Sequence, residues 1–426
     1  MASYLQEYFE QAAQREKLGI PPLALTEDFT KELCSLLLNP PVGAEKELLH
    51  LLKDRINPGV DASSKVKAQF LYEIASGKKV SPLVDKKLAV SLLGNMKGGF
   101  NVGYLIELLK DEALAQDAKV ALEHTLLIYN AFDEVAALAS NGNKVARELI
   151  ENWANATWFT SKEKYPKKLT LTVFKVAGET NTDDFSPAPD AWSRPDIPLH
   201  AQAMYKISRD DLKADVEGVK GPISTIENLK AKGNPLLFVG DVVGTGSSRK
   251  SAANSLIWHI GHDIEGVPNK RAGGVVVGGK IAPIFYTTLE DSGALPIEAD
   301  VSNLNSGDVV DLNVYDGTIT DHESGKVLTQ FALKTNTLLD EVRAGGRIPL
   351  IIGKDLTAKA RKYLNLPEST EFAKPVEVKA TGGFTRAQKI VGKACGLEGV
   401  RPGQYCQPVI ATVGSQDTTG PMTRDE

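Results

Sequence analysis

The chain has 426 residues, more than a single hydrophobic core normally serves, so we expect two or three domains. Apolar residues make up 42% and charged residues 24%, and no apolar run reaches the roughly eighteen residues of a membrane span, which excludes an integral membrane protein. The formal net charge of -5 argues against a general attraction to nucleic acid.

The N-terminal residues and the cysteine spacing bear on the cellular compartment of the protein. The first residues, MASYLQEYFEQAAQREKLG, carry acidic side chains and lack the basic and then apolar order of a secretory signal. The three cysteines, Cys34, Cys395 and Cys406, form no C-x-x-C pair and leave an odd number. These features predict a cytoplasmic protein in a reducing compartment, without a disulfide framework.

Residues 1–160 have the pattern of short amphipathic helices. Apolar residues recur at spacings of three and four, as in Val84, Leu88 and Leu92. Ser81 before Pro82 is typical of an N-cap and a first helical residue. Each helix is too short to bury its apolar face alone, so the pattern predicts either a stacked array resembling HEAT repeats or a compact helical bundle.

Beyond residue 160 the pattern changes to alternating, strand-like segments, which marks the first predicted domain boundary. Segments such as KKLTLTVFKVAG, PLLFVGDVVG and AGGVVVGGK alternate with helices predicted at 247–260, 281–291 and 336–343. The segment 301–334 contains the Asp-Gly turn of YDGTI and predicts a hairpin or meander. The second domain is therefore expected to be α/β with an antiparallel part.

The sequence after residue 372 changes character again. The stretch PESTEFAKPVEVKATGGF has the composition of a linker, with a hinge expected near 373–385. A helix-like TRAQKIVGKACG follows, and the closing GSQDTTGPMTRDE resembles the start of another helix that has nothing to pack against. We therefore expect the chain to be a fragment of a longer protein.

The octapeptide GTGSSRKS, residues 244–251, lies between an apolar strand and a predicted helix. It lacks the Gly-Lys of a P-loop and the third glycine of a dinucleotide fingerprint. Hydroxyl groups of Ser247 and Ser248, the Arg249 guanidinium and the N-H groups that begin the helix converge there, which suits a carboxylate. The alternative is that Ser247 caps the helix and Arg249 is solvated on its surface.

A second motif lies in GETNTDDFSPAPDAWSRPDIPLHA, residues 178–201, a loop too long for a mere connection. Its order of TNTDD, SPA and Arg194, followed later by GSSR, resembles the mobile domain of the aconitases. With AWSRPDIPLHA, VPNKRAGG and VGSQDTTGPMTRDE, the whole chain resembles the N-terminal half of the bacterial B-type aconitases, which are bifunctional aconitate hydratases and 2-methylisocitrate dehydratases.

The resemblance implies a domain order and a reaction. It implies a HEAT-like helical domain at 1–160, a swivelling β/β/α domain at 161–372, and at 373–426 a linker with the truncated start of the first catalytic domain. The implied substrates are citrate and isocitrate, interconverted through cis-aconitate on a [4Fe-4S] cluster, or 2-methylisocitrate. The family thus consists of hydro-lyases that need an iron-sulfur cofactor.

The matched motifs also imply residue roles. Ser247 would be the catalytic base and Ser248 a contact to substrate or oxyanion, while Arg249 and Arg194 would each clamp a carboxylate. Near the end of the chain, GSQD matches a loop that donates hydrogen bonds to substrate, although a simple helix cap would explain the same residues. The residues of that loop are Ser415, Gln416 and Asp417.

One departure from the family pattern limits these expectations. The resemblance places the three cluster ligands in the half that this sequence lacks, and Cys395 and Cys406 do not match them. His259 and His262 are three residues apart, but no third ligand is in view, so a structural role is favoured over a metal site. We expect no metal, no cofactor and no turnover in this chain alone.

A different class of function stays open beside the enzymatic one. The chain would then be a regulatory or interaction module, in which the helical region forms a homodimer or binds protein regulators. The resemblance also implies mRNA binding by the cluster-free form, although the sequence shows no basic and aromatic interleaving.

Overall fold

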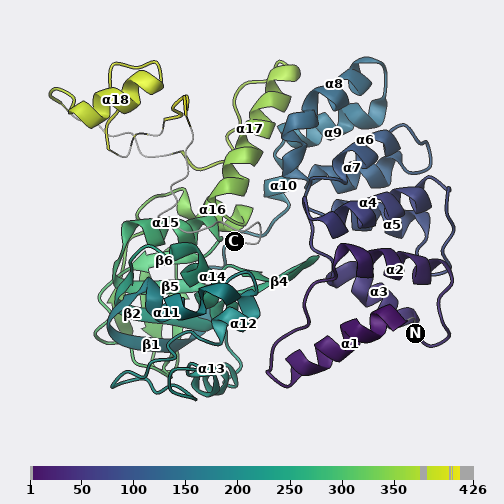
Figure 1. Cartoon of the computed structure of the whole chain (residues 1–426). Coiled ribbons are helices and arrows are strands. Elements are labelled where there is room, and N and C mark those ends of the chain that lie inside the picture. Colours follow the sequence, from purple (N-terminus) through teal and green to yellow (C-terminus); the bar gives the residue numbers. More distant parts are fainter. Residues whose placement is uncertain (1–2, 375–380, 403, 405, 413–426) are drawn as a thin grey trace.

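The structure is a computed structural model, and it describes residues 3–374, 381–402, 404 and 406–412. Figure 1 shows a helical part, drawn in purple and blue, beside an α/β part, drawn in teal and green. The expected mixture of an α region and an α/β region is confirmed. The boundaries at residues 160 and 372 stay a prediction.

The helical part consists of short helices that lie one above another in Figure 1. Asp61 and Asn143 are among the N-cap residues whose side chains accept a hydrogen bond from the first turn of a helix, which satisfies an otherwise unpaired N-H group. The helices are α1 (Ser3–Glu16), α2 (Glu27–Leu38), α3 (Glu45–Asp54), α4 (Ala62–Ala75), α5 (Lys86–Gly94), α6 (Val102–Leu108), α7 (Ala115–Glu123), η1 (Leu126–Ala131), α8 (Phe132–Ser140), α9 (Lys144–Ala154) and α10 (Thr157–Thr160).

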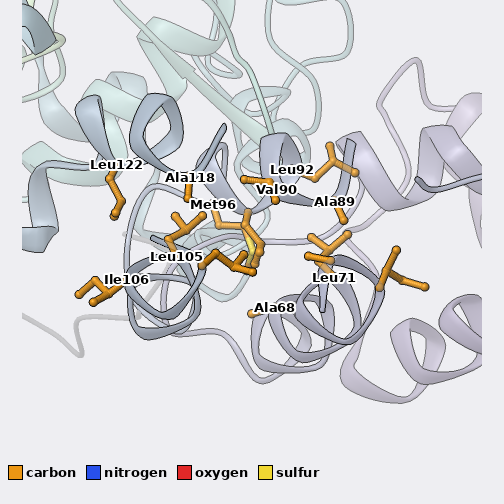
Figure 2. Close-up of a cluster of buried hydrophobic side chains, with 14 of the residues drawn as sticks. Ala68, Leu71, Ala89, Val90, Leu92, Met96, Leu105, Ile106, Ala118 and Leu122 are labelled. Carbon is orange, nitrogen blue, oxygen red and sulfur yellow. The ribbon is translucent and has the colours of Figure 1, made fainter. Parts of the chain in front are cut away.

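One continuous apolar core joins the helices from α1 to α9. Figure 2 shows Leu71 of α4, Leu92 of α5, Leu105 of α6 and Leu122 of α7 pointing toward the shared interior. Full burial of such a side chain stabilises the fold by about 1.5–3 kcal/mol. The three- and four-residue spacing of the sequence is therefore what gives each helix one apolar face.

The predicted cap at Ser81 and Pro82 is wrong. Helix α5 begins at Lys86, and the Asp85 carboxylate accepts the Leu88 N-H at 2.8 Å. Ser81 instead turns the chain before the helix, because its hydroxyl oxygen accepts the Val84 N-H at 3.2 Å. A Ser-Pro pair is thus compatible with a turn as well as with a helix start.

The α/β part is built on a seven-stranded sheet of order β6-β5-β2-β1-β7-β8-β9. Strands β1, β2, β5 and β6 run parallel, whereas β7, β8 and β9 form the predicted antiparallel meander. A separate hairpin consists of β3 and β4. The strands are β1 (Leu169–Asn181), β2 (Leu236–Thr245), β3 (His262–Ile264), β4 (Val267–Ala272), β5 (Val275–Ile281), β6 (Leu295–Glu298), β7 (Val309–Asn313), β8 (Thr318–Asp321) and β9 (Val327–Gln330).

Both faces of this sheet are covered, as its apolar strands require. Phe174 and Phe238 lie on one face with Leu256, while Val173 and Val239 lie on the other, as the period-two alternation of a strand dictates. The helices are α11 (Thr182–Phe185), η2 (Ala188–Ser193), α12 (Ile197–Ala201), α13 (Ile223–Lys230), α14 (Arg249–Ile260), α15 (Pro283–Asp291) and α16 (Leu338–Ala344), with α17 (Arg347–Tyr363) and α18 (Arg386–Ala394) following.

Helix α17 returns to the helical part. Its Leu356 and Ala360 belong to the same buried core as the helices of residues 3–154. Gly353 allows close approach, because a Cβ there would lie 2.3 Å from the indole ring of Trp158. The chain that follows the sheet is thus packed against α9 and η1, the last part of the helical region.

Replacing Gly353 with alanine should therefore destabilise the protein by about 2 kcal/mol, through overpacking against Trp158. The matched control is Gly103→Ala in α6, where an added Cβ meets nothing within 4 Å. That change should stabilise by about 0.5–1 kcal/mol, because alanine favours a helix. The midpoint of thermal unfolding checks both, and equal midpoints would contradict the packing of α17.

Direct polar contacts also join the two parts. The Arg15 guanidinium of α1 donates to both carboxylate oxygens of Asp196, at 2.5 and 2.8 Å. Asn269 of β4 accepts from Arg55 at 3.1 Å and donates to the Pro22 carbonyl at 2.8 Å.

Among the described helices, none combines the length and apolar character needed to cross a bilayer.

Candidate anion site at the start of helix α14

The site begins where β2 ends in a glycine turn. Gly244 and Gly246 have φ values of +79° and +108°, in the left-handed region that favours glycine. A Cβ on Gly244 would lie 2.2 Å from the Phe285 ring, and one on Gly246 would lie 2.4 Å from Oγ1 of Thr182. The two glycines thus let the turn lie directly against α11 and α15.

Gly246→Ala should cost about 2–3 kcal/mol, because both the backbone conformation and the contact with Thr182 resist a side chain. Gly142→Ala is the matched control, since Gly142 also has a positive φ, +92°, but an added Cβ meets nothing within 4 Å. It should cost only about 1 kcal/mol. Equal losses in thermal midpoint would show that the contact with α11 is unimportant.

Helix α14 begins shortly after the strand, and the N-H groups of its first turn point toward the glycine turn rather than to carbonyls of the same helix. Its N-cap is Ser248 rather than Ser247, and the Ser248 side chain makes no cap hydrogen bond. The first backbone hydrogen bond of the helix runs from the Ala252 N-H to the Ser248 carbonyl. The N-H groups of the first turn, which come before Ala252, therefore have no carbonyl partner within the helix. Such a helix start attracts an anion.

The structure brings Arg194 and Ser248 together. A guanidinium Nη2 of Arg194 donates to the Ser248 hydroxyl at 3.2 Å, across 54 positions of sequence. The Arg194 Nε is buried and has no hydrogen-bond partner among the described residues. A cation held at a helix start with a spare donor is a fitting counter-charge for a carboxylate.

Ser247 and Arg249 occupy different surroundings. Ser247 is exposed at the turn, and the Arg249 guanidinium donates to the Ser247 carbonyl at 3.4 Å. Arg249 also lines a hollow of about 650 Å³ between α14 and α15, together with Lys270 and Arg347. No contact of Arg249 with Arg194 is present in the described part of the chain, so the two predicted clamps do not meet in this structure.

Behind the site lies a buried polar chain that the sequence did not indicate. Nε2 of His200 lies 2.8 Å from Oγ of Ser186, and its Nδ1 lies 2.9 Å from Oγ of Ser193. Ser186 continues to Oγ of Ser251 at 2.8 Å. The one available signal was the alternation of serine and histidine with proline in a long loop, which is weak.

Burial fixes the charge of this histidine. Loss of hydration, together with the nearby Arg194 guanidinium, lowers the pKa of His200 to about 4, so the ring is neutral at pH 7. Thr182, at the start of α11, accepts the Ser248 N-H at 3.3 Å and ties the loop to the turn. The loop at 182–201 and α14 are thus joined from both sides.

The remaining predicted site residues fall elsewhere. Ser415, Gln416 and Asp417 lie outside the described residues. His259 is buried in α14, and its Nε2 lies 3.1 Å from the Ala201 carbonyl, which is a structural role, whereas His262 is exposed in β3.

The described cysteines do not fit an iron-sulfur cluster. Cys34 is buried in the helical core, and loss of hydration raises the pKa of its thiol to about 12, the reverse of what a thiolate ligand needs. Cys395 and Cys406 lie in the C-terminal segment, far along the chain from Cys34. Within the described ranges, no three His, Cys, Asp or Glu side chains are grouped to hold a metal ion.

Comparisons with known proteins show the family to which the chain belongs. Residues 171–384 match the family model of the aconitate hydratase 2 N-terminus, and residues 7–159 match that of the aconitate B N-terminal domain. The aconitate hydratases B of Salmonella typhimurium and Escherichia coli are each 56% identical over 99% of this chain, and that of Helicobacter pylori is 51% identical over 100%.

The matched region is only part of each relative, because the chain spans 49% of the length of these three proteins. A solved structure of 3-isopropylmalate dehydratase from Methanocaldococcus jannaschii covers 46% of this chain and 99% of its own, at 18% identity and a TM-score of 0.33, too weak a likeness to support an argument. The family models and the relatives together show that the chain belongs to the aconitate hydratase B family, whose N-terminal half it matches.

Proposed function

We propose that this chain is the substrate-gripping part of an aconitate hydratase, which isomerises citrate and isocitrate through cis-aconitate or dehydrates 2-methylisocitrate. The observation that carries the proposal is the Arg194 guanidinium held on Ser248 at the start of α14. A guanidinium, a hydroxyl and the positive end of the helix dipole together suit one carboxylate of a tricarboxylate.

The neighbouring residues then take separate roles. Ser247 is exposed and sits just before α14, so its hydroxyl can reach a bound ligand and remove a proton from carbon. The positive field of the helix start stabilises the alkoxide that this step requires. Arg249, on the first turn, clamps a second carboxylate from the side of the 650 Å³ hollow.

The chain supplies charge and orientation rather than the whole reaction. In this proposal residues 161–372 form a swivelling domain that closes over the rest of a full-length enzyme, and residues 1–160 form a HEAT-like platform beside it. Because the described cysteines do not fit a cluster, we assign the [4Fe-4S] ligands to the half that this chain does not include. The departure of hydroxide is accordingly assigned to no residue here.

Citrate titration of the 426-residue chain tests the anion site directly. We expect saturable binding, which Arg249→Ala should weaken at least about tenfold by removing a charge-assisted contact. The matched control is Arg147→Ala, because Arg147 lies on the helical part and forms an exposed ion pair with Glu151. Absence of binding, or equal binding by all three proteins, would sink the proposal.

Turnover tests the incompleteness of the chain. After anaerobic reconstitution with iron and sulfide, we expect no formation of cis-aconitate from isocitrate. Activity under these conditions would mean that the three cysteines of this chain, or a partner chain, supply a cluster.

A further inference from the structure

The buried chain of serine and histidine side chains lies on the inner side of the Arg194 and Ser248 contact. Its members are almost inaccessible, with exposed fractions of 0% for Ser186, 4% for Ser193, 1% for His200 and 3% for Ser251. Burying polar groups costs free energy unless each finds a partner, and packed apolar side chains would fill the space without that cost. Such a network therefore specifies a geometry more than it adds stability.

The network is connected to both members of the anion site. On one side, Ser193 immediately precedes Arg194 and lies 2.9 Å from Nδ1 of His200. On the other, Ser251 in the first turn of α14 donates to the Ser248 carbonyl at 3.2 Å. His200 is the residue through which these two sides meet, because Ser186 links its Nε2 to Ser251.

An imidazole suits this position because it offers two polar atoms on opposite edges of a rigid ring. A neutral ring has one N-H and one acceptor nitrogen and brings no net charge. The two hydroxyl groups also donate, Ser186 to Ser251 and Ser193 to the Asp190 carbonyl, so the ring donates to one hydroxyl and its second nitrogen shares the hydrogen of the other. A protonated His200 ring would place a second positive charge next to the Arg194 guanidinium, and the two charges would repel each other.

We propose that His200 is a positioning residue, which sets the distance between Arg194 and Ser248 by holding Ser193 on one edge and Ser186 on the other. The inference rests on the proposed function, since it concerns the same anion site. It gives His200 no contact with substrate. Its effect on ligand binding passes through the Arg194 guanidinium.

Citrate titration of His200 variants gives the first test. His200→Phe, which keeps a ring and removes both nitrogens, should weaken citrate binding about tenfold, and His200→Gln should recover part of the loss by replacing one polar contact. His259→Phe is the matched control, because His259 is also buried beside α12, where its Nε2 lies 3.1 Å from the Ala201 carbonyl and not from a serine of the network. It should lower the thermal midpoint yet change affinity less than about twofold.

A double-mutant cycle separates positioning from general loss of structure. If His200 acts through the guanidinium, His200→Phe should have little further effect on citrate affinity once Arg194 is replaced by alanine. Additive losses in the double variant would overturn the inference, as would equal affinity of wild type and His200→Phe.

Amide hydrogen exchange gives a readout that needs no ligand. In His200→Phe, exchange should accelerate at residues 186–196 and 248–251 and stay unchanged in α4, which lies in the separate helical core. If exchange accelerates in these segments but the wild type does not bind citrate, the positioning role of His200 is supported and the proposed function is rejected. Unchanged exchange in both segments would reject the positioning role itself.

Discussion

Arg15→Ala is expected to destabilise the protein by about 2 kcal/mol, which lowers the midpoint of thermal unfolding by about 2 °C in a protein of this size. The Arg15 and Asp196 side chains are 9% and 18% exposed, and two parallel hydrogen bonds join them. Removing the guanidinium leaves Asp196 as a largely buried, unpaired carboxylate. Because Asp196 is two residues from Arg194, citrate affinity should fall several-fold as well.

The control for this prediction is Arg147→Ala. Arg147 also pairs with a carboxylate, but its side chain is 56% exposed, and an exposed pair contributes well under about 1 kcal/mol. Asp196→Asn should also destabilise the protein, because the amide keeps one acceptor for Arg15 but leaves the largely buried guanidinium without its counter-charge. Differential scanning calorimetry distinguishes the variants, and equal midpoints for Arg15→Ala and Arg147→Ala would show that α1 does not anchor the loop.

The sequence predicted local elements well where several signals agreed. The helices expected at 247–260, 281–291 and 336–343 begin within two residues of α14, α15 and α16, because glycine or proline punctuation coincided there with apolar periodicity. The return of α17 to the helical part was beyond prediction. It depends on the contact between Trp158 and Gly353, which are 195 positions apart (353 − 158). No local sequence pattern predicts a contact over that separation.

The candidate site was predictable only in part, and for a similar reason. The resemblance named Arg194 and Ser248, which the structure brings together, but it could not show that Arg249 faces a separate hollow. The link through His200 was invisible, because a histidine in a loop carries no spacing signal until its two partners are placed in space.

Lys67→Met is expected to stabilise the protein by about 2 kcal/mol at pH 7, although it removes a charged residue. Lys67 of α4 is 3% exposed, forms no ion pair among the described residues, and donates only to the Lys53 carbonyl at 3.5 Å. Loss of hydration lowers the pKa of its ammonium group to about 8, from 10.5. Methionine fills similar space without this cost.

The pH dependence gives the sharper test of this buried lysine. Between pH 8 and 10.5 the folded state has released the Lys67 proton while the unfolded state still holds it, so the wild type gains stability as pH rises. Burial raises the pKa of Cys34 from 9.0 to about 12, so above pH 9 this thiol makes the folded state less stable as pH rises. The effect of Lys67 is therefore best measured between pH 8 and pH 9, where Cys34 contributes little. The stability difference between Lys67→Met and wild type should shrink by about 1 kcal/mol across that window. The exposed neighbour Lys65, changed to methionine, should show no such trend, and a constant difference for Lys67→Met would mean that its ammonium group remains hydrated.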